Sequence, residues 1–333
     1  MGKREDKKMS ILISRKTKVL IQGITGHQGT LQTKIMKEYG TQIVAGVTPK
    51  KGGTTIEGIP VYNSVKEACK EHKPQWSIIF VPREHTKQAA EEALQNNLNI
   101  VIITEHIPTH DVLKIKEKAK KKNKIMIGPN SPGIINPEQT KLGIMPQEFF
   151  KKGPIGVLSR SGTLTYEITN YLTEAELGQS TVMGIGGDAI NGFSFIDGLK
   201  EFAKDKETEA IVLIGEIGGI GEEDTAQFLR ETDYQKKYKK PIITYIAGKT
   251  APVGKNLGHA GALISRGKGS AATKITALRR EGVLCAKSPQ DIPNIVRKCL
   301  KKRENLSEKP QIFQEKHKNP KILREKLKII RMF

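Results

Sequence analysis

The stretch Lys18-Val-Leu-Ile-Gln-Gly-Ile-Thr-Gly-His-Gln-Gly-Thr30 joins a short apolar run to a turn with glycines at 23, 26 and 29. The apolar run predicts a buried strand, and the small residues after it predict a tight turn into a helix. The free N–H groups at the start of such a helix attract phosphate. Because the glycine spacing differs from Gly-x-Gly-x-x-Gly, the stretch indicates a phosphate-bearing ligand without specifying NAD.

The same alternation of apolar runs with helix-like segments continues through both halves of the chain. Nearly continuous apolar runs are typical of parallel strands that are buried on both faces. They lie at 18–22, 43–47, 77–81, 100–104 and 124–128, and again at 155–159, 182–185, 210–214, 242–245 and 283–285. We therefore predict two doubly wound α/β domains in tandem.

Changes in composition mark the expected domain limits. The stretch 130–152, rich in proline and glycine, interrupts the alternation and predicts a domain junction. The expected parts of the chain are a polar extension over 1–9, a first domain over 10–135, a junction over 136–152, a second domain over 153–300 and a basic tail over 301–333.

The strongly basic composition does not by itself indicate a nucleic-acid ligand. The formal net charge is +21, but the tail over 301–333 holds 11 Lys and Arg against 4 Asp and Glu. No recognition helix, RNA-binding aromatic motif or zinc finger accompanies the charge. We therefore expect no nucleic-acid partner.

Cysteine usage and hydropathy favour a cytoplasmic protein. Cys69, Cys285 and Cys299 are widely spaced and form no Cys-x-x-Cys pair, which argues against disulfides and a metal site and fits a reducing compartment. No apolar run reaches the ~18 residues that span a bilayer, and the N-terminus has neither a signal core nor an amphipathic leader. We expect no membrane partner.

Two small-residue segments at predicted strand ends carry candidate anion-binding groups. Thr48-Pro-Lys-Lys-Gly-Gly-Thr54 places two lysines beside glycines, either to neutralise a ligand phosphate or as a basic surface turn. In Ser159-Arg-Ser-Gly-Thr-Leu-Thr-Tyr-Glu167, Ser161 is the expected N-cap of a helix. The N–H groups of Gly162 and Thr163 are then free for an anion, although capping alone also explains the serine.

His259 is the most distinctive side chain of the sequence. It lies in Asn256-Leu-Gly-His-Ala-Gly-Ala-Leu-Ile-Ser265, where small neighbours allow a large anion to approach the ring. An imidazole can accept and release a phosphoryl group. Glu216, in Gly215-Glu-Ile-Gly-Gly219, is placed to accept an N–H from His259 and to fix its tautomer. The alternatives are an incidental histidine and a solvent-exposed loop acid.

Seven segments in this order resemble the α-subunit family of succinyl-CoA synthetase. They are Gly23-Ile-Thr-Gly-His-Gln-Gly-Thr30, Ile103-Thr-Glu105, Gly128-Pro-Asn130, Ser159-Arg-Ser-Gly-Thr-Leu-Thr-Tyr-Glu167, Gly184-Ile-Gly-Gly-Asp188, Gly215-Glu-Ile-Gly-Gly219 and Gly258-His-Ala-Gly-Ala262. The resemblance extends from residue 10 to about residue 300. It implies a Rossmann-like, coenzyme A-binding domain followed by a flavodoxin-like, doubly wound parallel-sheet domain.

The resemblance also implies an acid–thiol ligase of α and β subunits that makes succinyl-CoA from succinate, coenzyme A and a nucleoside triphosphate. Phosphohistidine and succinyl phosphate are the implied intermediates. The β subunit, which has an ATP-grasp fold, is implied to bind ATP or GTP with Mg²⁺. The preferred nucleotide and the choice between an αβ and an (αβ)₂ assembly stay open.

The family assigns roles to particular residues of this chain. By resemblance, His259 carries the phosphoryl group, Glu216 is its catalytic partner, and Tyr166 borders the carboxylate substrate. The helix start at Ser161, Gly162 and Thr163 is implied to hold the phosphate. The implied coenzyme A contacts are Thr25, Gly26, His27, Gln28, Lys51, Ile103, Thr104 and Glu105.

Four positions depart from the usual pattern of the family. Ser131 stands where a cysteine is common, and His106, Lys50 and Arg266 stand where glycine is usual. The last three add bulk or positive charge near sites for anions, so we expect them to affect specificity. The basic tail lies beyond the resemblance.

Other functions remain open at this level. Related nucleoside diphosphate-forming ligases activate malate, acetate or citrate, and the motif around Tyr166 favours succinate among these acids. A non-catalytic coenzyme A-binding regulator is disfavoured because His259 and Glu216 are both present. A Rossmann oxidoreductase is disfavoured by the glycine spacing and by the lack of a ribose-binding acid after the second strand.

Overall fold

The computed structural model describes residues 11–250, 259, 261–263 and 269–301. Its first sheet contains seven strands in the order β3-β4-β2-β1-β5-β6-β7. They are β1 (Lys18–Gln22), β2 (Gln42–Val47), β3 (Thr55–Ile56), β4 (Ile59–Tyr62), β5 (Trp76–Ile79), β6 (Asn99–Ile102) and β7 (Met126–Ile127). The helices are α1 (His27–Glu38), α2 (Val65–His72), α3 (Arg83–Gln95) and α4 (Thr109–Lys121).

The first sheet has the Rossmann order. Apart from β3, which pairs antiparallel with β4, its strands are parallel. Counted without β3, their spatial order is the 3-2-1-4-5-6 of dinucleotide-binding folds. The strand order reverses between β1 and β5, so the turns after these two strands border the crevice in which such sheets bind ligands.

The second sheet also has seven strands, in the order β14-β13-β12-β10-β11-β8-β9. They are β8 (Gly133–Asn136), β9 (Thr140–Gly143), β10 (Lys152–Ser159), β11 (Gln179–Gly184), β12 (Ala210–Glu216), β13 (Ile242–Ala247) and β14 (Leu284–Cys285). Its helices are α5 (Gly162–Glu174), α6 (Phe195–Lys204), α7 (Gly221–Thr232), α8 (Tyr234–Tyr238), α9 (Ala271–Arg280) and the helical residues 292–301.

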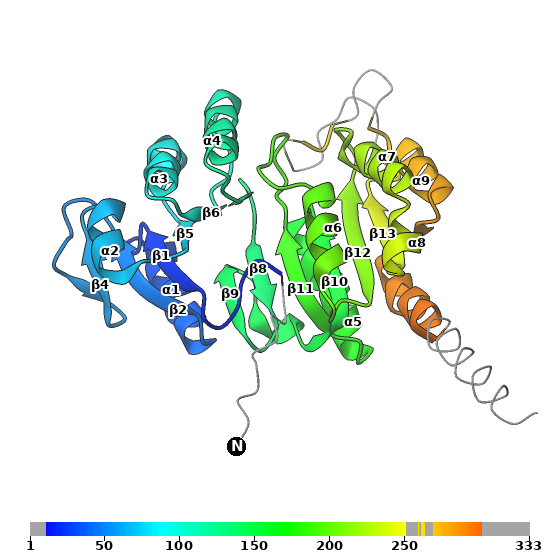
Figure 1. The fold of residues 1–333 in the computed structure, drawn as a ribbon, viewed down its shortest axis with the longest axis horizontal. Coiled ribbons are helices and arrows are strands. Elements are labelled where there is room, and N and C mark those ends of the chain that lie inside the picture. Colours follow the sequence, from blue (N-terminus) through cyan, green and yellow to red (C-terminus); the bar gives the residue numbers. More distant parts are fainter. Residues whose placement is uncertain (1–10, 251–258, 260, 264–268, 302–333) are drawn as a thin grey trace, which may run out of the picture.

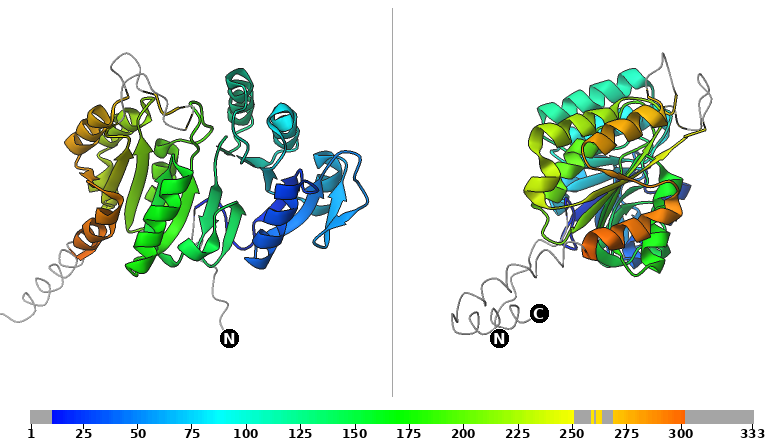
Figure 2. Two further views of the ribbon diagram at one scale, coloured as in Figure 1. Left: turned by 180° about the vertical axis from the view of Figure 1, so that it is seen from behind. Right: turned by 90° about the vertical axis from the view of Figure 1, so that its right-hand side faces the viewer.

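The parallel part of this sheet, β10 to β14, has the 2-1-3-4-5 order of flavodoxin-like folds, as predicted. Figure 2 shows helices on both of its faces, with α6, α7 and α9 on one side and α5 with residues 292–301 on the other. The strand order reverses between β10 and β12. Ser161 lies in the loop that follows β10, and Glu216 is the last residue of β12, directly before the next loop.

The apolar runs form strands because they fill the interior between helical layers. Val19, Leu20 and Ile21 of β1 are fully buried, and all residues of β12 from Ala210 to Glu216 are buried. Because burial of apolar surface contributes ~25 cal/mol per Å², these buried strands stabilise both sheets. Within the described residues, no helix combines the length and apolar character that a membrane span requires.

The stretch 130–152, which we predicted to be a junction, contributes the hairpin β8–β9 to the second sheet. Strand β8 pairs antiparallel with β11, with Ile135 opposite Val182. The hairpin also contacts the first domain, because Thr41 Oγ1 donates to the Lys141 carbonyl at 2.7 Å. Figure 1 shows β8 and β9 between the two halves. Local composition indicated a break, but the apolar Ile134 and Leu142 pair across the hairpin.

Candidate active site

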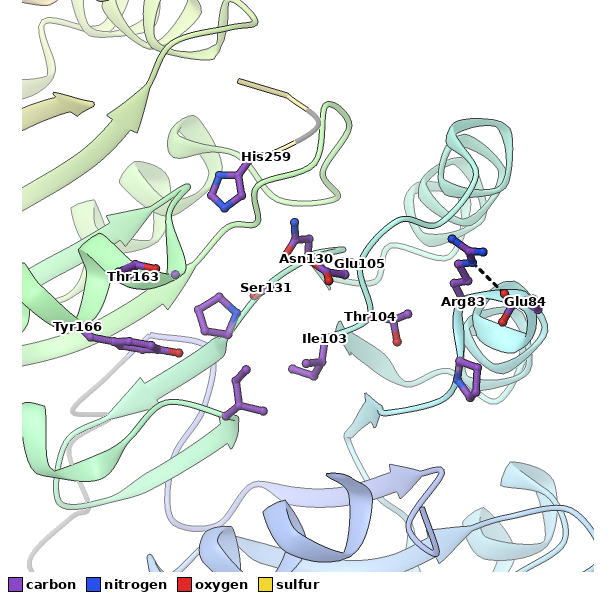
Figure 3. A pocket seen from close by; sticks show the side chains of 14 residues that line it. Arg83, Glu84, Ile103, Thr104, Glu105, Asn130, Ser131, Thr163, Tyr166 and His259 are labelled. Atoms are coloured by element: carbon purple, nitrogen blue, oxygen red, sulfur yellow. Dashed lines mark hydrogen bonds and ion pairs between the residues drawn. The ribbon is translucent and has the colours of Figure 1, made fainter. Parts of the chain in front are cut away.

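A cavity of about 670 Å³ lies between the two domains (Figure 3). The first domain contributes the end of β6 and the start of α3, and the second contributes the start of α5 and His259. The lining residues are Pro82, Arg83, Glu84, Ile103, Thr104, Glu105, Asn130, Ser131, Pro132, Ile144, Gly162, Thr163, Tyr166 and His259. Both halves of the chain are therefore needed to form this cavity.

The ring of His259 is held by the carboxylate of Glu216, at the end of β12. His259 Nδ1 lies 2.8 Å from Glu216 Oε2, as the sequence predicted. This hydrogen bond, opposed by burial, raises the pKa of His259 above its ordinary value of 6.5. Because Nδ1 is engaged by Glu216, Nε2 is the ring nitrogen that can react.

Glycine makes room for the imidazole ring. A Cβ atom on Gly187 would lie 2.5 Å from His259 Cγ, so the ring rests directly on this backbone. The Gly261 N–H donates to the Gly187 carbonyl at 3.3 Å. Of the small residues around His259, Gly261 and Ala262 are buried, whereas Gly258 and Ala260 lie outside the described residues.

Several charged residues that the sequence analysis did not single out surround the His259–Glu216 pair. Arg160 NH2, after β10, lies 3.5 Å from Glu216 Oε1. Arg160 NH1 lies 3.3 Å from Glu222 Oε1 in the first turn of α7, and Lys274 of α9 pairs with the other oxygen of Glu222. The sequences of α7 and α9 do not predict that Glu222 and Lys274 are buried, because charged residues at such positions usually lie on the solvated face of a helix. Only the fold brings them together.

Asp188 is a further acidic neighbour of His259. It is 7% exposed, and its Oδ1 accepts a hydrogen bond from Asn130 Nδ2 at 3.1 Å. Burial raises the pKa of Asp188. The Gly-Gly-Asp motif marked the segment, but nothing in the sequence alone placed its carboxylate beside the histidine.

The start of α5 faces the cavity with its backbone. Ser161 is the N-cap, as predicted, because its Oγ accepts the Leu164 N–H at 3.3 Å. Gly162 and Thr163 line the cavity, and nothing lies within 4 Å of a Cβ built on Gly162. A helix start with open space before it suits an anion through its N–H groups and its dipole.

Tyr166 lies one turn further along α5 and also lines the cavity (Figure 3). Its ring stacks on Phe149, with 6.2 Å between centroids and 26° between planes. Burial raises the pKa of Tyr166 to about 12. Its hydroxyl therefore stays protonated at neutral pH and can donate to a carboxylate.

The expected coenzyme A contacts occupy two places. Ile103, Thr104 and Glu105 line the cavity. Thr104 is fixed by its hydroxyl, which donates to the Val81 carbonyl at 2.7 Å, and by its carbonyl, which accepts the Asn130 N–H at 3.0 Å. This strand end is therefore rigidly positioned.

The other expected contacts lie outside the cavity lining, at the carboxyl ends of β1 and β2. Thr25 Oγ1 and Thr48 Oγ1 are 3.2 Å apart, which brings the two loops together. Gly26 caps α1 without a side-chain hydrogen bond, and the first turn, which includes His27 and Gln28, has no acidic residue. Lys51 is exposed on the neighbouring loop. The donors and charge at this edge fit phosphate groups.

The departures from the family pattern differ in their surroundings. Ser131 lines the cavity and is 3% exposed, and its Oγ donates to the Gly184 carbonyl at 2.6 Å. Lys50 and His106 have φ values of 65° and 58°, in the region that favours glycine. Arg266 lies outside the described residues.

Known proteins are similar to this chain in sequence and in fold. The sequence model of the CoA binding domain family matches residues 14–106, and that of the CoA-ligase family matches residues 158–284. The chain is 50% identical over 293 residues to succinate–CoA ligase [ADP-forming] subunit alpha 2 of Archaeoglobus fulgidus, covering 88% of this chain and 100% of that one. It is 50% identical over 296 residues to the corresponding alpha subunit of Aquifex aeolicus, covering 88% and 95%.

A solved structure shares the arrangement of both domains. ATP citrate lyase from Methanothrix soehngenii matches with a TM-score of 0.80 at 23% identity, over 89% of this chain and 52% of the other. The chain thus spans about half the length of that protein, and the likeness concerns the fold alone.

Proposed function

The chain belongs to the succinate–CoA ligase α-subunit family, and from this membership we infer that His259 carries a phosphoryl group during ligation. It contains the CoA-binding domain and the CoA-ligase domain of that enzyme, in that order. The single observation that carries the proposal is the contact between His259 Nδ1 and Glu216 Oε2. This contact leaves Nε2 free, and His259 lines the same cavity as Gly162 and Thr163 at the start of α5.

The reaction proceeds in three displacements. Nε2 of His259 attacks the γ-phosphorus of the nucleotide and the nucleoside diphosphate leaves. A succinate carboxylate oxygen then attacks phosphorus and forms succinyl phosphate, which restores the imidazole. Finally the thiolate of coenzyme A attacks the acyl carbon and phosphate leaves. The two covalent intermediates divide one difficult transfer into easier steps.

This chain's residues bind and orient the reactants. Glu216 stabilises the charged imidazole as the N–P bond forms, and the N–H groups of Gly162 and Thr163, held by the Ser161 cap, receive the phosphoryl oxygens. The hydroxyl of Tyr166 donates a hydrogen bond to the succinate carboxylate. These roles are supported by the cavity that Gly162, Thr163, Tyr166 and His259 line together. They are also supported by the raised pKa values of His259 and Tyr166.

Coenzyme A extends from the loops after β1 and β2 into the cavity. Thr25, Gly26, His27, Gln28 and Lys51 bind its phosphates. Ile103, Thr104 and Glu105 line the route of its thiol arm toward His259. This placement of coenzyme A is supported by the start of α1, which has no side-chain cap, and by the position of Ile103, Thr104 and Glu105 in the cavity lining.

A partner subunit supplies the nucleotide. We place ATP with Mg²⁺ on a β subunit, for which the family resemblance implies an ATP-grasp fold. The choice of ATP is supported by relatives at 50% identity that are named as ADP-forming alpha subunits. The low number of cysteines in the sequence and the absence of any Cys-x-x-Cys pair support a reducing compartment such as the cytoplasm.

Co-purification with the β subunit, followed by assays with succinate, malate, citrate and acetate, tests this proposal. We expect CoA ester formation with succinate and an acid-labile, base-stable phosphate on His259. Label that survives His259→Ala contradicts the proposed carrier, and preference for another acid contradicts the proposed substrate.

A further inference from the structure

Four charged side chains form a buried chain of ion pairs at the edge of the candidate site. We call Arg160, Glu216, Glu222 and Lys274 the charge network. They come from the ends of β10 and β12 and from α7 and α9, and their side chains are at most 10% exposed. Burying an ion costs several kcal/mol unless it is paired, so each member depends on its neighbours.

Glu222 contacts all three other members of the charge network. One of its oxygens accepts from Arg160 NH1 and also from the Glu216 backbone N–H, at 3.2 Å, while Lys274 pairs with the other oxygen. The Gly218 carbonyl accepts from Arg160 NH1 at 3.1 Å. These contacts orient the guanidinium so that its other nitrogen, NH2, meets Glu216 Oε1. Arg160 thus reaches the same carboxylate that His259 contacts through Oε2.

The charges of these four residues balance without His259. Two carboxylates, Glu216 and Glu222, face two cations, Arg160 and Lys274, so an uncharged imidazole leaves the sum at zero. If Arg160 lost its charge, the sum would reach zero only with an imidazolium. Arg160 therefore opposes protonation of the ring, whereas Glu216 favours it.

We propose that Arg160 lowers the protonated fraction of His259, and so favours its nucleophilic form, by sharing the Glu216 carboxylate with it, and that Glu222 and Lys274 hold Arg160 in that position. Arg160 is then a positioning residue for the phosphoryl transfer. The inference rests on the phosphohistidine function proposed above.

The remaining charged groups do not replace this effect. Asp188 faces His259 from the loop after β11 and, like Glu216, raises the pKa of the ring. Glu223 of α7, a partly exposed carboxylate outside the charge network, lies 3.1 Å from Lys274 Nζ. The positive charge of Arg160 opposes these carboxylates and lowers the pKa of His259, in the same direction as burial.

The test is the pH dependence of His259 phosphorylation in the complex with the β subunit. The parent rate rises with pH as His259 loses its proton. In Arg160→Gln the midpoint of this rise moves up by about one pH unit, because a cation near the ring is lost. The rate at pH 7 then falls up to about tenfold, while the rate at pH 9 stays within about twofold of the parent.

Two variants separate this role from a structural one. Arg160→Lys keeps the charge and is expected to return the midpoint toward that of the parent. Arg230→Gln removes an arginine of α7 whose side chain is 66% exposed and is expected to leave the profile unchanged. Coenzyme A affinity, measured by calorimetry, should be equal in all four proteins.

Each other outcome contradicts the proposal in a distinct way. An equal loss of rate at every pH means that Arg160 contacts the phosphoryl group directly, and an unchanged profile means that it has no effect on His259. An insoluble Arg160→Gln beside a soluble Arg160→Lys with a shifted midpoint also overturns it, because charge alone is then insufficient. If the parent acquires no label on His259, the proposed function itself fails.

Discussion

His259 Nδ1 lies 2.8 Å from Glu216 Oε2, although the two residues are 43 positions apart in the chain. The contact joins the end of β12 to a segment that follows β13. In the proposed phosphoryl transfer Nε2 is then the nitrogen that reacts, because Nδ1 is hydrogen-bonded to the carboxylate and is unavailable to an incoming phosphoryl group. The chemistry of the site therefore depends on the neighbouring positions of two strand ends.

Glu216→Gln keeps the size of the side chain and removes its charge. We expect His259 phosphorylation to slow by roughly 10²- to 10⁴-fold, the range of a positioned acid–base partner, with coenzyme A affinity unchanged. The pKa of His259 should also fall, because the carboxylate is the main cause of its elevation. Single-turnover labelling across pH measures both effects. Glu231→Gln, on the exposed face of α7, is the matched control, and an equal loss of coenzyme A binding would show a structural role instead.

Gly187→Ala tests the seat of the imidazole ring. The new Cβ would lie 2.5 Å from His259 Cγ, so the ring must move away from its place beside Glu216. A displacement of about 1 Å costs on the order of 10²-fold in rate, and we expect a loss of that size in phosphohistidine formation. Gly221→Ala introduces a methyl group with nothing within 4 Å and serves as control. Parent-like labelling of Gly187→Ala would mean that the ring does not need this seat.

Lys51→Glu tests the coenzyme A phosphates. Reversing this charge beside the start of α1 should weaken coenzyme A binding most at low ionic strength, where screening is least. Phosphorylation of His259 by nucleotide should persist, because that chemistry belongs to the second domain. Calorimetry at two salt concentrations measures the first effect and labelling the second. Lys34→Glu, further along α1, controls for net charge, and parent-like affinity of Lys51→Glu would place the phosphates elsewhere.

Burial of Lys141, where the hairpin β8–β9 contacts the first domain, should make the free energy of unfolding depend on pH. It is 1% exposed, its Nζ donates to the Met145 carbonyl at 2.8 Å, and burial lowers its pKa from 10.5 to about 8. Because the unfolded chain binds the extra proton between about pH 8 and 10.5, the free energy of unfolding should rise with pH in this window. Below pH 8 the charged amine is buried and the full penalty applies.

The comparison with Lys141→Met isolates this contribution. Denaturation followed by the fluorescence of Trp76, the one tryptophan of the sequence, should show the parent gaining stability relative to the variant from pH 8 to 10. Lys120→Met, on an exposed position of α4, should run parallel to the parent. A constant difference between parent and Lys141→Met across this range would show that the amine keeps its ordinary pKa.

The sequence by itself determined the two parallel sheets and the segments that approach the site. Apolar runs such as 210–214 and, apart from the exposed Lys18, 18–22 are buried on both faces, so their composition alone predicts their place. Glycine and hydroxyl residues at strand ends likewise marked His259, Glu216 and Ser161, because local chemistry restricts what can follow a buried strand.

Only the tertiary structure decided how these segments combine. Strands β8 and β9 join the second sheet through partners distant in sequence, which composition in 130–152 concealed. Arg160, Glu222 and Lys274 meet because β10, α7 and α9 converge at one end of the sheet. A buried ion pair leaves no periodic signal in the chain, since its stability depends on desolvation and on a partner that only the fold supplies.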